Sequence, residues 1–260
     1  MDLGLRDRVC IVTGASQGIG LAISRRLAGE GARVLMVARG EERLQAAAHP
    51  LGAEWLAADV TDPDCVQRVV ATAVEQFGAL DVLVNNAGTS AHVPLERLTD
   101  DDYRAHFELN VVASIGLMRR AAPHMAQRGW GRIVNVASSS GKRPSSSNAA
   151  YSVAKAAQLS ASRAYADAYA GRGVLVNAIT PGPVETPLWM GEGGLADQAA
   201  EIAGTTRDEA LAAARGKLPI GRFATPEEIA DVAVFLCSER AGFVTGAAWS
   251  VDGGTVPIIV

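Results

Sequence analysis

Residues Val9–Gly20 read VCIVTGASQGIG, a short apolar run followed by a glycine-rich turn that opens a helix-length segment. The glycines stand at positions 14, 18 and 20. Glycine lets the backbone turn tightly and approach a pyrophosphate at a helix N-terminus. Many strand-to-helix turns need glycine for steric reasons alone. The stretch therefore predicts a βα unit, and it leaves both the dinucleotide and the purely steric interpretation open.

The same alternation continues along the chain. The apolar runs are Val9–Val12, Arg33–Ala38, Trp55–Ala58, Asp81–Asn85, Arg132–Val136, Val174–Ile179 and Ala247–Val251. The helix-length segments are Gly18–Glu30, Glu41–Ala48, Pro63–Phe77, Asp101–Met125, Ala149–Ala170 and Pro226–Ser238. This βα repeat predicts an α/β fold, in which a parallel sheet is covered by helices on both faces.

Composition limits the classes of function. The chain has 260 residues, 48% of them hydrophobic, which suits one α/β domain over residues 1–260. Its 24 basic and 28 acidic residues give a net charge of −4 without a long block of either sign, so we expect no nucleic-acid or membrane partner.

The cysteines and the N-terminus bear on metal binding and location. Cys10, Cys65 and Cys237 lie far apart and outside any metal-ligand spacing, so we expect buried thiols and no metal. The apolar run near the N-terminus is too short for a signal segment or a membrane span. We therefore expect a cytoplasmic protein.

The polar and glycine-rich features share one position relative to the predicted strands. Ligands of open α/β sheets bind beyond the carboxyl ends of the strands. The residues at these ends are Gly14, Arg39, Asp59, Asn85–Gly88, Ser138 and Pro181–Gly182. The sequence therefore predicts a ligand site along one rim of the sheet. For Asn85 a purely structural role, tying neighbouring strands together, is an equal alternative.

Tyr151 and Lys155 stand four residues apart in AAYSVAKAA, and Ser138 lies thirteen residues before Tyr151. Side chains at i and i+4 share one face of a helix. A lysine ammonium beside a tyrosine stabilises the phenolate and lowers the phenol pKa from its usual value near ~10. Such a phenol can exchange a proton with a substrate. A YxxxK pattern alone more often marks a core tyrosine and a solvated lysine.

Arg39 ends the second apolar run, where an NAD site would place an acidic residue against the ribose 2′-hydroxyl. A cation there suits the 2′-phosphate of NADP, so we expect NADP(H) to be preferred over NAD(H). Alternatively Arg39 is solvated, and Glu41 or Glu42 turns inward to bind NAD. Gln17 is uncharged where a second cation would help.

These residues together resemble the short-chain dehydrogenase/reductase family over nearly the whole chain, in particular its 3-oxoacyl-(acyl-carrier-protein) reductases. The resemblance rests on TGASQGIG, the DV of AADV, NNAG, Asn110, Ser138, YSVAK, PGPVET and the closing VDGG. It implies a single-domain Rossmann-type doubly wound sheet of about seven strands in the order 3-2-1-4-5-6-7. It also implies a homotetramer. Gln17 and the long segment after Pro183 depart from the family pattern.

The resemblance also implies a catalytic tetrad of Asn110, Ser138, Tyr151 and Lys155. Ser138 would donate to the substrate oxygen and Tyr151 would pass the proton. Lys155 would lower the Tyr151 pKa and bind the nicotinamide ribose, and Asn110 would hold a water beside Lys155. The residues implied for dinucleotide binding are Gly14, Ser16, Gln17, Gly18, Ile19, Gly20, Arg39, Asp59, Val60, Asn86, Ala87, Gly88, Tyr151, Lys155, Pro181, Gly182, Val184 and Thr186.

The segment 183–218 is too long for a plain connector and combines glycines (GEGG) with a helix-like patch, LADQAAEIAG. It follows Pro181–Gly182 at the predicted rim. We expect a substrate-binding lid, and the alternative is a static surface segment. Trp189 and Met190 either cap a pocket or pack internally.

Three further residues have weaker claims. His92 follows NNAG and could line a substrate pocket, although a solvent-exposed loop histidine is the commoner case. Lys142 and Arg143 flank Ser138 and could meet an acidic substrate group, although a solvated position is again commoner.

The sequence thus predicts an oxidoreductase that interconverts a ketone and a secondary alcohol by hydride transfer, most simply an NADPH-dependent carbonyl or 3-oxoacyl reductase. A dehydrogenase of a hydroxy acid, polyol, terpenoid or steroid is the alternative. A non-catalytic dinucleotide sensor is a third class, against which the intact tetrad argues. The substrate and the physiological direction stay open, because one fold serves many substrates.

Overall fold

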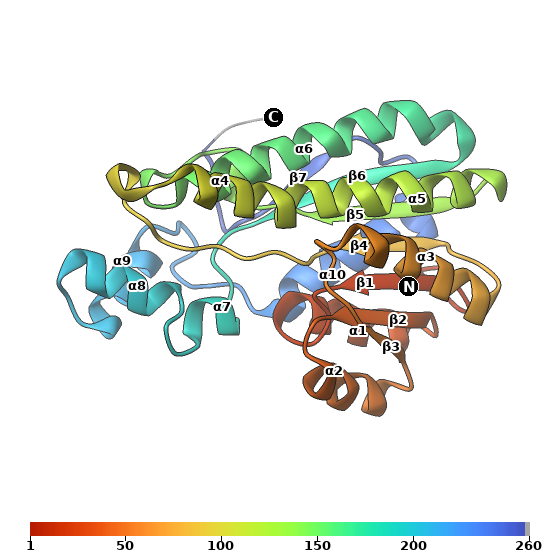
Figure 1. Ribbon diagram of the computed structural model, residues 1–260, viewed down its shortest axis with the longest axis horizontal. Coiled ribbons are helices and arrows are strands. Elements are labelled where there is room, and N and C mark those ends of the chain that lie inside the picture. Colours follow the sequence, from red (N-terminus) through yellow and green to blue (C-terminus); the bar gives the residue numbers. More distant parts are fainter. Residues whose placement is uncertain (258–260) are drawn as a thin grey trace.

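The computed structural model describes residues 1–257 as one parallel sheet between two layers of helices (Figure 1). The strands are β1 (Val9–Thr13), β2 (Arg33–Ala38), β3 (Glu54–Ala57), β4 (Val82–Asn85), β5 (Gly131–Val136), β6 (Val174–Pro181) and β7 (Ala248–Val251). Their order is β3-β2-β1-β4-β5-β6-β7 with every pairing parallel, which confirms the predicted order. The chain order reverses between β1 and β4, where such sheets open a ligand crevice.

Helices cover both faces of the sheet. They are α1 (Gly18–Gly29), α2 (Glu41–Ala48), α3 (Pro63–Phe77), α4 (Asp100–Phe107), α5 (Ala113–Gln127), α6 (Ala149–Tyr169), α7 (Pro187–Met190), α8 (Leu195–Ala203), α9 (Arg207–Gly216) and α10 (Pro226–Cys237). Alternate side chains of β1 point to opposite faces. Cys10 and Val12 pack with α1, α2 and α10, whereas Val9 and Ile11 pack with α3, α5 and α6. All three cysteines are buried free thiols, as expected.

The prediction of a single helix over Asp101–Met125 is wrong in one respect. A π-helical turn at Glu108–Val112 separates α4 from α5. In this turn the Asn110 side chain donates a hydrogen bond to the main-chain carbonyl of His106 at 3.0 Å, so a side-chain amide binds a carbonyl of the preceding helical turn. Wider turns of this kind are rare and are often found at functional sites. Helical periodicity in the sequence continues through the turn and therefore does not reveal it.

The segment 183–218 forms a small lobe beyond the carboxyl ends of the strands, where Figure 1 shows α7, α8 and α9. The helix-like patch at 195–204 is confirmed as α8. The lobe has its own apolar cluster, in which Ala196, Leu211 and Leu218 are buried together with Phe223, a residue that follows the segment. Helix α9 was not predicted, although a capping box between Thr206 and Glu209 marks its start.

Candidate active site

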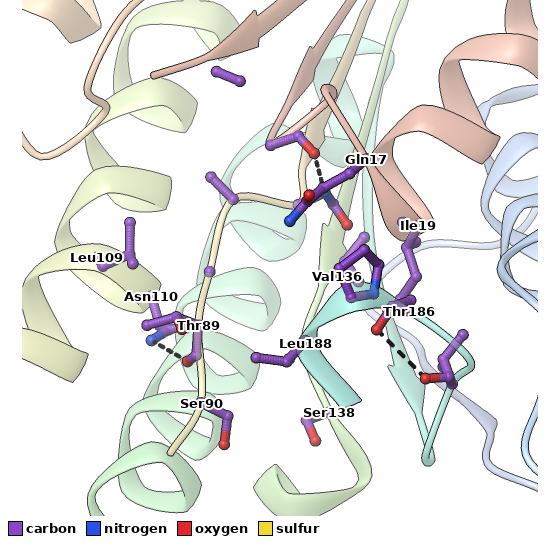
Figure 2. Close-up of a pocket in the computed structure, with 18 of the residues that line it drawn as sticks. Gln17, Ile19, Thr89, Ser90, Leu109, Asn110, Val136, Ser138, Thr186 and Leu188 are labelled. Atoms are coloured by element: carbon purple, nitrogen blue, oxygen red, sulfur yellow. Dashed lines mark hydrogen bonds between the residues drawn. The ribbon is translucent and has the colours of Figure 1, made fainter. Parts of the chain in front are cut away.

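A cavity of about 970 Å³ opens at the carboxyl ends of the strands (Figure 2). It collects residues from each of the six predicted strand ends: Gly14, Arg39, Asp59, Asn86–Gly88, Ser138 and Pro181–Gly182. Every residue predicted for catalysis or for dinucleotide binding lines it, except Gly20. The sequence rule that ligands bind beyond the strand ends therefore located the cavity.

Gly20 lies behind the glycine-rich turn. A Cβ atom there would be 2.3 Å from the carbonyl oxygen of Gly14, so the turn can close this tightly only because residue 20 is a glycine. Gln17 precedes α1 without a side-chain capping bond, and the first turn of α1 has no acidic residue. The first N–H groups of a helix lack partners within it. These groups remain free for an anion, which fits the expected phosphates.

The outer end of the cavity carries two cations. Arg39 follows β2, and Arg43 in α2 donates to the Gln17 side chain at 2.7 Å. Asp59 opposite them accepts two hydrogen bonds from Thr61, which lower the pKa of Asp59, and Arg39 lowers it further. Sequence reasoning missed Arg43. Its spacing of four from Arg39 was the available signal.

Asparagine side chains hold the strand ends together below the cavity. Asn86 donates to the carbonyl of Thr13 at 2.9 Å, and the Thr13 hydroxyl accepts from the amides of Asn86 and Ala87. Asn85 donates to Asn135 on the neighbouring strand at 2.8 Å, and Asn135 donates to Ser162 of α6 at 3.0 Å. The Asn85 side chain therefore serves the structural role named as its alternative.

Ser138 and Tyr151 meet at the inner end of the cavity. Ser138 follows β5, and its Oγ accepts from the amide of Ser140 at 3.1 Å. Tyr151 lies in the first turn of α6. Burial raises the pKa of Tyr151 to about 12, while a hydrogen bond with Ser138 lowers it by a smaller amount. The expectation that Lys155 sets a low Tyr151 pKa is therefore wrong for this state of the site, because desolvation dominates.

Lys155 is buried one helical turn after Tyr151. Its Nζ donates to the carbonyl of Val136 at 2.9 Å and to Oε1 of Gln158 at 3.0 Å, and it lies 5.6 Å from the centroid of the Tyr151 ring. Burial lowers the pKa of Lys155 to about 7. Gln158, itself 1% exposed, was missed by the sequence analysis. The i+3 spacing from Lys155 was the signal that could have identified it.

Asn110 faces the same end of the cavity from the π-helical turn. Its Nδ2 donates within its own turn and lies 3.5 Å from the carbonyl of Thr89, a contact drawn in Figure 2. Its Oδ1 is buried without a hydrogen-bond partner. A Cβ atom at Gly88 would stand 2.6 Å from this oxygen and 3.6 Å from Lys155 Nζ, so glycine allows the close approach. An unpaired acceptor beside a lysine fits the predicted site for a water.

The remaining wall comes from the end of β6 and from the lobe. Thr186 is the N-cap residue of α7, and its hydroxyl donates to the carbonyl of Val184. Trp189 lines the cavity, and its ring also packs against Phe223 of the lobe's apolar cluster, with ring centroids 5.0 Å apart, so both interpretations of Trp189 hold. Met190 packs against the lobe cluster and does not line the cavity. His92 lines the cavity beside Trp189, so the pocket interpretation of this residue is supported.

Lys142 and Arg143 do not line the cavity. The Lys142 ammonium donates to the carbonyl of Ala248 at 2.6 Å and to the hydroxyl of Ser250 at 3.0 Å. Arg143 donates to the carbonyl of Thr255. Both side chains anchor the loop after Ser138 to the C-terminal part of the sheet.

Among residues 1–257, no cluster of three or more histidine, cysteine or acidic side chains is placed to hold a metal ion. No helix in the same range is long and apolar enough to cross a membrane.

Comparison with known proteins gives consistent matches. A family model described as enoyl-(acyl carrier protein) reductase matches residues 14–256. The chain is 40% identical to cis-4-hydroxycyclohexanecarboxylate dehydrogenase of Sinomonas cyclohexanicum, over 95% of this chain and 96% of that protein. It is 34% identical to the 3-oxoacyl-(acyl-carrier-protein) reductase FabG of Thermotoga maritima, over 97% and 99% of the two chains.

Solved structures agree. The crystal structure of L-sorbose reductase from Gluconobacter frateurii, complexed with NADPH and L-sorbose, matches with a TM-score of 0.92 and 38% identity over 100% of both chains. The NADPH complex of an actinorhodin polyketide ketoreductase variant, F189W, matches with the same score at 35% identity, over 97% of this chain and 98% of that one.

Proposed function

The chain belongs to the short-chain dehydrogenase/reductase family and is an oxidoreductase that interconverts ketones and secondary alcohols, and from this premise we propose that it is an NADPH-dependent carbonyl reductase. The observation that carries the proposal is the group formed by buried Ser138 and Lys155 with half-buried Tyr151 at the inner end of the large cavity. A nicotinamide dinucleotide bound in the rest of the cavity would supply the hydride.

Each tetrad residue has a proposed role that its contacts support. Ser138 donates a hydrogen bond to the carbonyl oxygen as negative charge develops on it. Tyr151 delivers the proton to that oxygen. Lys155 keeps one ammonium N–H beyond its bonds to Val136 and Gln158, and we assign this N–H to the ribose hydroxyls. Asn110 offers its unpaired oxygen to a water beside Lys155.

The state of Tyr151 favours the reducing direction. With its pKa raised to about 12 by burial, the phenol is protonated throughout the neutral range, and the protonated form is the one that donates to a carbonyl. Alcohol oxidation needs the opposite form. The second candidate is a dehydrogenase that oxidises a hydroxylated substrate. It is supported by the 40% identity to cis-4-hydroxycyclohexanecarboxylate dehydrogenase.

The experiment that tests the proposal measures NADPH and NADH consumption with a panel of ketones that includes a 3-oxoacyl thioester, and the reverse reaction with the matching alcohols. We expect NADPH-dependent reduction of at least one ketone class. Turnover of alcohols alone would favour the dehydrogenase. Dinucleotide binding without turnover of any compound would favour the sensor.

The proposed preference for NADPH rests on the two cations at the outer end of the cavity. Arg39 stands where NAD enzymes carry an acidic residue, and Arg43 is held toward the same end by Gln17. Arg43 therefore supplies the second positive charge that Gln17 lacks. Glu41 and Glu42 also line this end of the cavity, where either carboxylate could accept a hydrogen bond from the ribose 2′-hydroxyl of NAD, which is the alternative to NADPH.

Arg39→Asp is expected to lower kcat/KM for NADPH by about 10- to 100-fold, because a charge-assisted bond to the 2′-phosphate is replaced by repulsion. The kcat/KM for NADH should stay constant or rise. Steady-state kinetics with both cofactors measure the change. Arg25→Asp makes the same charge change on the exposed face of α1 and should leave the cofactor ratio unaltered. Equal kcat/KM for the two cofactors in the native protein would contradict the preference.

We also propose that the segment 183–218 is a substrate lid of the single domain. Its helix α8 is tied to the inner end of the cavity, because Gln198 accepts a hydrogen bond from the His92 amide at 2.8 Å and donates to the carbonyl of Gly193 at 2.9 Å. Leu188, Trp189 and Leu195 of the lobe face the cavity. Closure of such a segment excludes water from a hydride transfer.

Gln198→Ala removes the bond from the lid to His92, and we expect it to raise KM for the ketone about fivefold, in line with the loss of ~1 kcal/mol. The Kd of NADPH should not change. Glu201→Ala, at an exposed position of the same helix, serves as the control. Hydrogen exchange over 183–218 should slow when cofactor and substrate bind. Insensitive exchange, together with unchanged substrate kinetics in the variant, would indicate a static surface segment.

The proposed assembly is a homotetramer. Phe107, Val112 and Val153, on the α4–α6 side of the molecule, are 43%, 41% and 52% exposed, which is high for apolar side chains. The alanine-rich α6 permits a close helix approach across a symmetry axis. Three buried free thiols suit the reducing cytoplasm that we propose as its location.

A further inference from the structure

Ser90 is a buried hydroxyl in the wall of the active-site cavity. The side chain is 6% exposed, and its Oγ has no hydrogen-bond partner. Ser90 follows the Asn86–Gly88 segment, and Figure 2 shows it across from Ser138, at the end of the cavity away from Gln17. A buried hydroxyl without a partner destabilises a fold, so such a group calls for an explanation such as a ligand.

His92 lines the same cavity two residues later and has a second unsatisfied polar atom, its buried Nδ1. Its ring packs edge-on against Trp189, with centroids 5.9 Å apart. Burial lowers the pKa of His92, a hydrogen bond to the Ser147 backbone raises it by a smaller amount, and Lys217 lowers it further, so the imidazole is neutral at neutral pH. A neutral imidazole has one donor and one acceptor nitrogen.

The rest of this end of the cavity limits what can bind there. Leu188, Trp189 and Leu195 make an apolar wall. Among the described residues, the cations that line the cavity are Arg39 and Arg43 at the outer end and Lys155 beside Tyr151. The Ser90–His92 side thus offers neutral donors and acceptors in the cavity wall, and a further cation, Lys217, does not line the cavity but acts on His92. An alkyl chain would leave both polar atoms unpaired.

We propose that Ser90 and His92 form a subsite for a hydroxyl group that the substrate carries in addition to the carbonyl that reacts. A hydroxyl donates and accepts, as do the Ser90 hydroxyl and a neutral imidazole, so the three groups can satisfy one another. The substrate class is then a hydroxylated ketone, cyclic or short-chain, with the corresponding diol as product. The inference rests on the proposed carbonyl reductase function and specifies its substrate.

The test uses two matched pairs of ketones with NADPH, namely 4-hydroxycyclohexanone with cyclohexanone and 1-hydroxy-2-butanone with 2-butanone. In the native protein, kcat/KM should favour the hydroxylated member of at least one pair by about tenfold or more, as for sites that hydrogen-bond a substrate hydroxyl. Ser90→Ala and His92→Phe should each abolish most of that ratio. His92→Phe keeps an aromatic ring beside Trp189. Ser146→Ala, an exposed position outside the cavity, should keep the native ratio.

Binding distinguishes failure of the subsite from failure of the proposed function. Calorimetry on the NADPH complex of Tyr151→Phe should show tighter binding of 4-hydroxycyclohexanone than of cyclohexanone, with or without turnover in the native protein. NADPH binding by Ser90→Ala confirms that this variant folds. Equal affinity for the two ketones, or a ratio that neither Ser90→Ala nor His92→Phe changes, would overturn the inference. Absence of all ketone turnover with the affinity difference intact would overturn only the reductase proposal.

Discussion

Tyr151→Phe is expected to lower kcat for ketone reduction by about 10² or more, because the phenol is the proposed proton donor and the substitution keeps the ring while removing the proton. The phenylalanine ring still fills the place of the tyrosine ring at the start of α6, so the Kd of NADPH should stay within about twofold. Steady-state kinetics and a fluorescence titration of NADPH measure the two quantities.

Tyr103→Phe is the matched control, since Tyr103 lies on α4 and does not line the cavity. Native-like turnover in Tyr151→Phe would refute the proton-transfer role. In the native protein, alcohol oxidation should accelerate as pH rises toward the Tyr151 pKa of about 12, because oxidation requires the deprotonated phenol. Reduction should show no such rise, because the phenol is already protonated at neutral pH.

Ser138→Ala is expected to lower kcat by about 10²- to 10³-fold, the range for losing one donor aimed at a developing oxyanion. The phenol should then lose the hydrogen bond that lowers its pKa, and the alcohol-oxidation profile should shift to higher pH. A purely structural role for Ser138 in its short turn would not move this profile.

Ser139→Ala provides the control for the choice of serine. Ser139 also lines the cavity, and only the thirteen-residue spacing to Tyr151 distinguished Ser138 in the sequence. We expect Ser139→Ala to keep kcat within about twofold. The reverse pattern, a large loss in Ser139→Ala and a small one in Ser138→Ala, would move the donor role to Ser139.

The parts of this molecule that could be predicted are those that follow from local sequence pattern and backbone geometry. The alternation of apolar runs with helix-length segments predicted a parallel sheet covered by helices, and the residues at the strand ends predicted the rim that carries the ligand site. The i+4 spacing correctly placed Tyr151 and Lys155 together. The same spacing gave the wrong pKa for Tyr151, because a sequence does not show how far burial outweighs a neighbouring charge.

The parts that escaped prediction depend on contacts between elements far apart in the sequence. Arg43 in α2 acquires its significance from Gln17, the residue that precedes helix α1, and the sequence does not show that the two side chains meet. The π-helical turn adds one residue to a local turn without disturbing the apolar pattern around it. Gln158 is the exception, since its spacing from Lys155 was visible, but a buried glutamine has no distinguishing mark in a sequence.

The Asn135 side chain has a mechanical consequence for the active site. Asn135 pairs in register with Asn85, so a slip of β5 against β4 by one residue would turn the two amides to opposite faces and break their bond. Its bond to Ser162 fastens β5 to α6. Ser138 follows β5, and Tyr151 lies in α6. The Asn135 side chain therefore resists sliding of β5 against α6, and the alignment of these two elements sets the distance between the Ser138 and Tyr151 hydroxyls.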